Sequence, residues 1–179
     1  MSGGAGSNHN HRCAEPADHA LGRSRGGWTT KIHAACDGAG RPLALHLTGG
    51  NVNDTTQFAQ VLAGICVPRL GPGRPRTRPG YVVADKGYSS RANRALLRSR
   101  GIGHTIAEPA DQQTHRRRRG RRGGRPVGYD RRRYARRNHI ERCFNRLKQW
   151  RGIATRYCKT ATNYRGALDL AALLMWTAT

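Results

Sequence analysis

The chain has 179 residues, with 33 lysines and arginines against 10 aspartates and glutamates, which gives a formal net charge of +23. This length suits one domain, since single domains commonly hold roughly 100 to 200 residues. The charge excludes an ordinary neutral soluble enzyme and indicates a polyanionic partner.

Membrane-spanning, secreted and zinc-ribbon proteins are excluded as well. The five cysteines are odd in number and never spaced as C-x-x-C, so they favour neither a disulfide framework nor a zinc ribbon. No apolar run approaches the roughly 20 residues of a membrane span. Residues 1–10 also lack the apolar centre of a signal peptide. We therefore expect a cytoplasmic protein with no membrane partner.

The first predicted elements follow a segment without apolar periodicity. Residues 1–26 are rich in Gly, Ser, His and Arg and are predicted to be poorly ordered, so that the domain covers residues 27–179. Residues 28–34 and 42–48 alternate between apolar and polar side chains around a turn at Asp37, which predicts a β-hairpin.

Helices and strands alternate in the rest of the chain. The predicted elements are a helix capped by Asp54 and ended by Gly64, an exposed loop at 68–80, a buried strand at 81–84, a helix from Ser90 to Gly101, a strand at 102–107, a polar Arg-dense insertion at about 112–133, and helices at 134–150 and 164–176. The sheet comes first and the last helices pack on it, which predicts an α/β or α+β layer arrangement.

Asp85 is the first of two acidic residues that lie where a reaction would need them. It directly follows the predicted strand 81–84, and Gly87 lets the backbone turn tightly just beyond the carboxylate. Two interpretations stay open for Asp85. It is either a functional carboxylate at the end of a strand or a cap of the following turn.

Glu141 is the second of these acidic residues. At ~100° per residue, Tyr134, Arg137, Glu141 and Lys148 fall within one narrow stripe of a helix. Apolar residues lie beside this stripe, so the helix buries one flank and presents a polar row along its edge, as active-site helices often do. In the alternative interpretation, Arg137 and Glu141 form only an exposed ion pair four residues apart.

These residues resemble the DDE transposases of bacterial insertion sequences, closest to the insertion-sequence five group. Tyr134, Arg137, Glu141 and Lys148 meet the spacing Y-x2-R-x3-E-x6-K, and residues 84–88 read A-D-K-G-Y. Further segments carry the resemblance: 22–31 (GRSRGGWTTK), 37–42, 47–54 (LTGGNVND), 116–126 and 142–159.

The resemblance implies both a fold and a chemistry. The fold would be RNase H-like, as in retroviral integrases, with a mixed α/β sheet flanked by helices. Cutting DNA and rejoining it uses two Mg²⁺ ions about 3.5 to 4 Å apart, which activate the attacking oxygen and stabilise the leaving one. Mg²⁺, or Mn²⁺ in its place, takes oxygen ligands, so Asp85 and Glu141 would hold the metal. Tyr134, Arg137 and Lys148 would then position phosphates.

The first acidic residue of the family, and the strand that carries it, are missing from this sequence. Glu15 and Asp18 flank Pro16 in a stretch without β-branched residues, which is not typical of a strand. Asp37 is a candidate substitute, although it lies in the predicted hairpin turn. We therefore expect a partial RNase H-like domain that lacks its first strand, from a truncated, decayed or second-frame transposase.

Arginine is concentrated between residues 116 and 137, where twelve arginines occur with Asp130 as the only acid. Such blocks are solvated or bind nucleic acid, and a nuclear localisation signal is the rival interpretation. We expect this segment to lie along the DNA backbone, where contacts position the protein without reading sequence. The predicted DNA-binding residues are Arg116, Arg117, Arg118, Arg119, Arg121, Arg122, Arg125, Arg131, Arg132, Arg133 and Arg136.

Two functions remain open at this point. In the first, the chain is a transposase fragment that binds double-stranded DNA at transposon ends and target, and the intact enzyme is a nucleoid-associated bacterial homodimer that cleaves and transfers strands. In the second, it is a non-catalytic DNA-binding remnant. The missing first acid discriminates between them, since a two-metal site with one ligand lost is incomplete.

Overall fold

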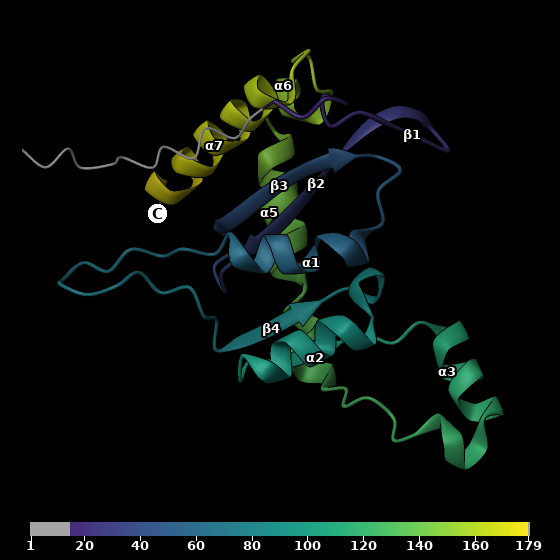
Figure 1. The fold of residues 1–179 in the computed structure, drawn as a ribbon. Helices are drawn as coiled ribbons and strands as arrows, with labels where there is room; N and C mark the ends of the chain where they lie inside the picture. The colour runs from purple at the N-terminus through teal and green to yellow at the C-terminus, as the bar shows by residue number, and fades with distance from the viewer. Residues whose placement is uncertain (1–14, 179) are drawn as a thin grey trace, which may run out of the picture.

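The structure, a computed structural model, describes residues 15–178 of the chain. Its strands are β1 (Gly22–Ser24), β2 (Gly27–Cys36), β3 (Pro42–Gly49), β4 (Tyr81–Ala84) and β5 (Gly103–Ile106). Its helices are α1 (Asp54–Ala63), α2 (Arg91–Ser99), α3 (Ala110–Arg118), α4 (Arg131–Ala135), α5 (Asn138–Lys148), α6 (Arg151–Ala154) and α7 (Ala161–Thr177). Short 3₁₀ turns cover Lys86–Tyr88 (η1) and Gly120–Gly123 (η2). Strands and helices thus mix along the chain (Figure 1), which confirms the α/β prediction.

The predicted hairpin is the first sheet. β2 pairs antiparallel with β3, with Ile32 opposite Leu47, and β1 adds a short antiparallel pairing to the first residues of β2. Asp37 forms the turn, because its carboxylate accepts hydrogen bonds from the backbone N–H groups of Ala39 and Arg41, both at 2.9 Å. This is the turn chemistry for which Asp is favoured.

The chain is ordered earlier than the sequence predicts. Strand β1 lies within residues 15–26, and Ala20 is buried. Glu15 fixes the start of α7, since its carboxylate accepts hydrogen bonds from the backbone N–H groups of Ala161 and Thr162, both at 2.7 Å. Residues 15–26 thus contain a strand and long-range contacts, which the sequence did not predict because it lacks apolar periodicity there. Residues 1–14 lie outside the described part of the chain.

The second sheet is a parallel pair. β4 and β5 align with Val83 opposite Thr105, and α2 connects them. Ser90 caps α2 by accepting a hydrogen bond from the N–H of Asn93, as predicted for the start of this helix. Leu97 on α2 is fully buried against the sheet. Over residues 15–178, β4 pairs with β5 and with no strand of the hairpin.

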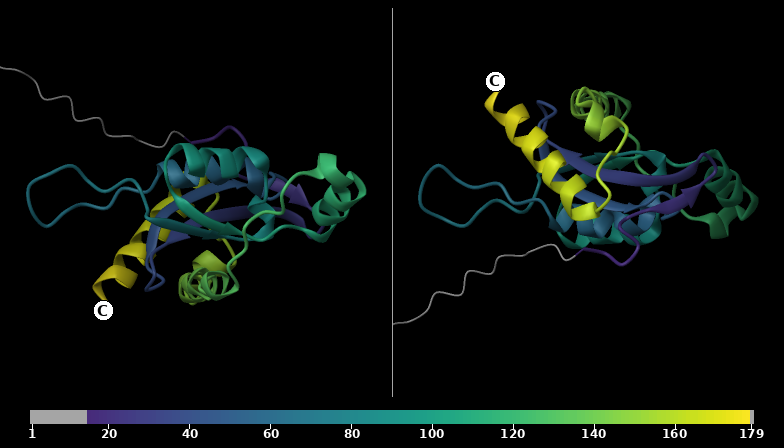
Figure 2. Two further views of the ribbon diagram at one scale, coloured as in Figure 1. Left: turned by 90° about the horizontal axis from the view of Figure 1, so that it is seen from below. Right: turned by 90° about the horizontal axis from the view of Figure 1, so that it is seen from above.

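Two apolar clusters hold the layers together. In one, α5 and α7 pack on the hairpin around Leu147 and Leu168; in the other, α1 and α2 pack with the parallel pair around Phe58 and Leu97. Figure 2 shows α5 on one side of the strands and α1 with α2 on the other. No helix within residues 15–178 is long and apolar enough to cross a membrane.

Three local predictions need correction. Asn53, not Asp54, caps α1, because the Asn53 side chain accepts from the N–H of Thr55. The predicted helix 134–150 is two helices, since backbone bonds three residues apart replace the usual spacing around Arg136 and Arg137. The Arg-dense segment is partly helical: α3 and η2 project from the body of the molecule (Figure 1), opposite the exposed loop 68–80.

Candidate functional site

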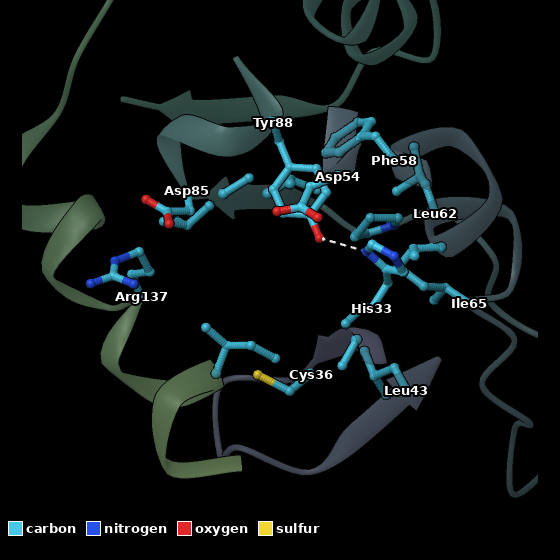
Figure 3. A pocket seen from close by; sticks show the side chains of 18 of the residues that line it. His33, Cys36, Leu43, Asp54, Phe58, Leu62, Ile65, Asp85, Tyr88 and Arg137 are labelled. Carbon is cyan, nitrogen blue, oxygen red and sulfur yellow. Dashed lines mark hydrogen bonds between the residues drawn. The ribbon is translucent and has the colours of Figure 1, made fainter. Parts of the chain in front are cut away.

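A cavity of about 500 Å³ lies between the hairpin and the parallel pair, enclosed by α1 and α5 (Figure 3). Three carboxylates line it: Asp54, Asp85 and Glu141. They lie far apart in the sequence, on α1, at the end of β4 and on α5. The fold therefore gathers three of the ten acidic residues around one space.

Asp85 caps the turn that follows β4 and also lines the cavity. Its carboxylate accepts a hydrogen bond from the N–H of Lys86 at 2.7 Å, which caps the η1 turn. The same oxygen accepts a second hydrogen bond from the Tyr134 hydroxyl at 3.3 Å, 49 residues away in sequence. Asp85 remains exposed, so it is oriented by two donors and still open to a ligand.

Glu141 lies in the first turn of α5 and reaches the same cavity. Its carboxylate is 2.8 Å from the Arg137 guanidinium, and this ion pair is half-exposed. Arg137 also lines the cavity and faces it from the side of Asp85 in Figure 3. The predicted polar edge of the helix is therefore present, and the four-residue ion pair of the alternative interpretation is part of it.

Neither Tyr134 nor Lys148 lines the cavity, but Tyr134 contacts the lining residue Asp85. Burial, followed by the nearby charge of Asp85, raises the pKa of Tyr134, so its hydroxyl keeps its proton and donates to that carboxylate. The Arg137 guanidinium lies 5.8 Å from the Tyr134 ring centre. Lys148 is exposed at the last residue of α5 and is not part of the lining. Two helical turns separate it from Glu141, roughly 10 Å along the axis.

Asp54 and Lys31 form an ion pair in the lining of the cavity, which was not predicted from the sequence. Lys31 Nζ lies 2.9 Å from the Asp54 carboxylate and 2.8 Å from the Val52 carbonyl oxygen. Asp54 also approaches the Asp85 turn, because a Cβ added to Gly87 would meet Asp54 Oδ2 at 3.5 Å. A signal was available: Asp54 ends the LTGGNVND segment that carries the family resemblance.

The floor of the cavity is uncharged at neutral pH. Burial lowers the pKa of His33, partly offset by the charge of Asp54. Burial, together with the charges of Asp54 and Asp85, raises the pKa of Tyr88 to about 12. The Tyr88 hydroxyl lies 3.4 Å from His33 Nδ1, the contact drawn in Figure 3. Charge is thus confined to the rim, where the carboxylates lie.

The carboxylates suit a hard divalent cation by chemistry, and Asp85 and Glu141 would hold it together with phosphate and water ligands. Asp85 and Glu141 offer the oxygen ligands that Mg²⁺ prefers, and Mg²⁺ in phosphate-processing sites uses one or two carboxylates together with substrate phosphates and water. Within residues 15–178, no group of three or more His, Cys, Asp or Glu side chains is close enough to hold a metal ion. Asp37 is not a substitute, because its carboxylate is engaged in the hairpin turn and by Arg41.

Most of the predicted DNA-binding arginines lie on an exposed arm. We use "arm" for residues 110–133, which carry α3 and η2. Arg116 is half-buried and paired with Glu108, so it is withdrawn from solvent; Arg133 lies 3.3 Å from Asp130 and its guanidinium stacks 4.2 Å from the Tyr81 ring centre. The others are exposed, and four of them, Arg118, Arg119, Arg121 and Arg122, line one shallow depression.

Comparisons with known proteins identify a family and two similar proteins. The family described as "Transposase DDE domain" matches residues 14–176. A putative transposase for insertion sequence element IS402 from Burkholderia cepacia is 46% identical over 79 residues, which cover 44% of this chain and 37% of that protein. A putative transposase for IS6501 from Brucella ovis is 32% identical over 150 residues, 83% of this chain and 98% of that protein. No solved structure matches the chain.

Proposed function

Because the chain belongs to the transposase DDE domain family, we propose that it acts in DNA transposition by binding DNA beside a two-carboxylate metal site. In the intact enzyme this site would catalyse metal-dependent phosphodiester cleavage and strand transfer at insertion-sequence ends. One observation carries the proposal: Asp85 and Glu141, from elements far apart in sequence, line one cavity together with Arg137.

Each predicted site residue is given a role from its contacts or from its place on α5. Asp85 and Glu141 would hold Mg²⁺ or Mn²⁺, which supplies Lewis-acid stabilisation of phosphate oxygens when bound. Tyr134 orients Asp85 through its hydroxyl. Arg137, once its carboxylate partner binds metal, is free to contact a phosphate, while Lys148 contacts the DNA backbone farther along α5.

The arm supplies affinity rather than chemistry. Nine of the predicted DNA-binding arginines are exposed and form no ion pair within residues 15–178. Eight lie on the arm and the ninth just after it: Arg117, Arg118, Arg119, Arg121, Arg122, Arg125, Arg131, Arg132 and Arg136. Unpaired guanidinium groups release DNA counterions when they contact phosphates, so binding should depend steeply on salt.

A DNA-binding remnant without catalysis is the second candidate. It is favoured by the absence of a three-ligand cluster in the described part of the chain. The chain spans about a third of the IS402 relative, so the activity of a whole transposase is proposed for the intact enzyme only. We expect the 179-residue chain alone to nick DNA very weakly or not at all in Mg²⁺ or Mn²⁺.

The metal site is tested by Mn²⁺ binding, followed by water-proton relaxation. Asp85→Asn and Glu141→Gln should each weaken binding by about a hundredfold or more, since even outer-shell partners of a metal are worth roughly 10- to 100-fold. Asp169→Asn on α7, paired with Arg165 away from the cavity, is the matched control and should leave binding unchanged. Equal Mn²⁺ affinity in all three variants would refute the site.

Further expectations concern the intact enzyme. It acts on double-stranded transposon ends and target DNA in the bacterial cytoplasm, associated with the nucleoid. It belongs to the insertion-sequence five group, has the RNase H-like fold and works as a homodimer, because two DNA ends must be brought together. Sedimentation with and without DNA tests the dimer.

A further inference from the structure

A second pocket, of about 710 Å³, lies where the arm returns to the body of the molecule. We call it the basic pocket. Its lining consists of Arg94 and Arg98 on α2, His104 on β5, and residues 125–128 of the arm. Figure 1 shows the chain that follows α3 running back toward α2. The lining contains no acidic residue, in contrast to the cavity, which three carboxylates border.

Arg94 is a buried cation without an acidic partner. It is only 8% exposed, and its guanidinium donates to neutral oxygens, the Ser89 hydroxyl and the Ile106 carbonyl, both at 3.1 Å. Arg94 forms no ion pair within residues 15–178, and Glu108, whose charge acts on it, is paired with Arg116. Arginine stays protonated in proteins, and buried charges are normally paired. An anion in the pocket would therefore compensate the charge of Arg94.

The other basic side chains of the pocket are available to a ligand. Arg98 and Arg125 are exposed, and neither guanidinium has a hydrogen bond or an ion pair in the described part of the chain. His104 Nδ1 lies 3.3 Å from the Ile102 carbonyl oxygen, so Nε2 is the ring nitrogen that remains for a ligand. The charge of Arg98 also opposes that of Arg94, whose pKa it lowers. Like charges in one pocket repel each other, and a bound anion removes this cost.

We propose that the basic pocket binds a phosphate group between Arg94, Arg98, His104 and Arg125. A guanidinium presents paired donors that match two phosphate oxygens, and several cations around one space favour an anion of high charge. The pocket shares no residue with the cavity or with the shallow depression of the arm. It should therefore hold one phosphate at a fixed place, whereas the arm attracts a phosphate backbone in general.

Two sources supply this ligand chemistry. One is a phosphodiester of the DNA backbone, which would extend the DNA-binding surface from the arm to α2; only this source rests on the proposed function. The other is a free polyphosphate. Pyrophosphate is the probe for the pocket itself, because it carries the phosphate group without DNA.

Calorimetric titration of the full 179-residue chain with pyrophosphate, at constant ionic strength, tests the pocket. Arg98→Gln and Arg125→Gln should each weaken the tightest binding about tenfold, since a hydrogen bond to a charged group is worth roughly that factor. Arg69→Gln and Arg74→Gln in the exposed loop 68–80 remove the same charge and should change it by less than about twofold. Equal losses in all four variants, or no loss in any, would overturn the proposal.

Arg94→Met removes the buried charge and keeps most of the side-chain volume. It should weaken pyrophosphate binding at least about tenfold and abolish the rise in melting temperature that pyrophosphate gives the unchanged protein. Tight binding by a folded Arg94→Met variant would contradict the proposal. If this variant does not fold, the Arg98 and Arg125 variants decide, because both of those side chains are exposed.

Phenylglyoxal, which modifies exposed arginines, locates the bound phosphate within one chain. Pyrophosphate should slow the modification of Arg98 and Arg125, followed by mass spectrometry of peptides. Arg118 and Arg121 in the depression of the arm are internal controls and should react at an unchanged rate. Protection of the depression in place of the pocket would show that the proposal is wrong.

A labelled DNA duplex distinguishes the two sources. If a backbone phosphate occupies the pocket, Arg98→Gln should reduce the salt slope of DNA binding by about 0.9, for one lost contact. Pyrophosphate should then compete with DNA for the unchanged protein more strongly than for this variant. If the variant loses pyrophosphate but binds DNA unchanged, the pocket stands and its ligand is a free polyphosphate. If the duplex does not bind at all, the proposed function fails, and the pyrophosphate titration still decides the pocket.

Discussion

The cavity rim and the arm use charge in opposite ways. At the rim, Asp85, Glu141 and Asp54 each have a defined partner, so their carboxylates are oriented before any ligand arrives. On the arm, most arginines are exposed and form no ion pair within residues 15–178. Catalysis needs groups that are held in a fixed geometry, as the carboxylates of the rim are. Binding to a phosphate backbone needs only positive charges close to the phosphates, as the unpaired arginines of the arm provide.

The two regions also differ in what supports them. The residues of the rim lie on strands and helices whose side chains form the two apolar clusters. In contrast, α3 of the arm contributes no buried residue. Changes at the arm should therefore alter DNA affinity without altering folding. Changes in the apolar clusters beneath the rim should alter folding without altering DNA affinity.

The largest effect is expected on the arm. In the first variant Arg118, Arg119, Arg121 and Arg122 are replaced with Gln. The slope of log K for DNA binding on log salt concentration should then become shallower by up to about 3.6, since each lost phosphate contact contributes about 0.9. Removing the four arginines of the exposed loop, Arg69, Arg74, Arg76 and Arg78, gives a control of equal charge. Equal slopes for the two variants would show that net charge, not the arm, binds DNA.

The next effect is on stability. Leu147 is fully buried in the cluster beneath α5, so Leu147→Ala should lower the free energy of unfolding by about 2 to 5 kcal/mol. Arg122→Ala on the arm should change it by less than about 0.5 kcal/mol. Urea denaturation measures both. A large loss from the Arg122 variant would contradict the separation of the two regions.

Tyr134 links the regions, because it directly follows the last residue of the arm and its hydroxyl donates to the Asp85 carboxylate. Tyr134→Phe should weaken Mn²⁺ binding by about tenfold, the lower end for an outer-shell partner, with no change in the DNA salt slope. Tyr129→Phe is the matched control, since its ring packs on Tyr134 with the centres 5.2 Å apart. If the two variants behave alike, Tyr134 does not orient Asp85.

The smallest effect is a pH dependence of stability. Burial lowers the pKa of His33 below 6.5, so the unfolded chain takes up a proton first as the pH falls. The free energy of unfolding should therefore decrease below about pH 6.5, by at most ~1.4 kcal/mol per pH unit for this group. His33→Gln should flatten the curve between pH 4.5 and 6.5 in chemical denaturation. An unchanged slope would mean that His33 is not buried in solution.

Much of the fold could be predicted from local patterns in the sequence. The hairpin, the strand before Asp85, the helix capped by Ser90 and the strand after it were all predictable, because alternation and capping are written in neighbouring residues. The break between α4 and α5 at Arg136 and Arg137 could not be predicted, since both residues are good helix formers. The change of hydrogen-bond spacing there depends on what each helix packs against.

The candidate site was predictable in its residues more than in its layout. Asp85 and Glu141 stood out by position, and the structure places both at one cavity. Asp54 did not, because its approach to the Asp85 turn follows from how α1 packs against η1. The withdrawal of Arg116 from the arm was equally hidden, since Glu108 lies eight residues away on the other side of Pro109.

The sequence by itself determined the charge of +23, the order of elements from the hairpin to β5, and the kinship with the transposase DDE domain. Each is a property of residue type and near-neighbour spacing. Only the tertiary structure decided that three carboxylates border one cavity, and that this cavity separates two strand edges. Both depend on contacts between segments tens of residues apart, whose register no local pattern fixes.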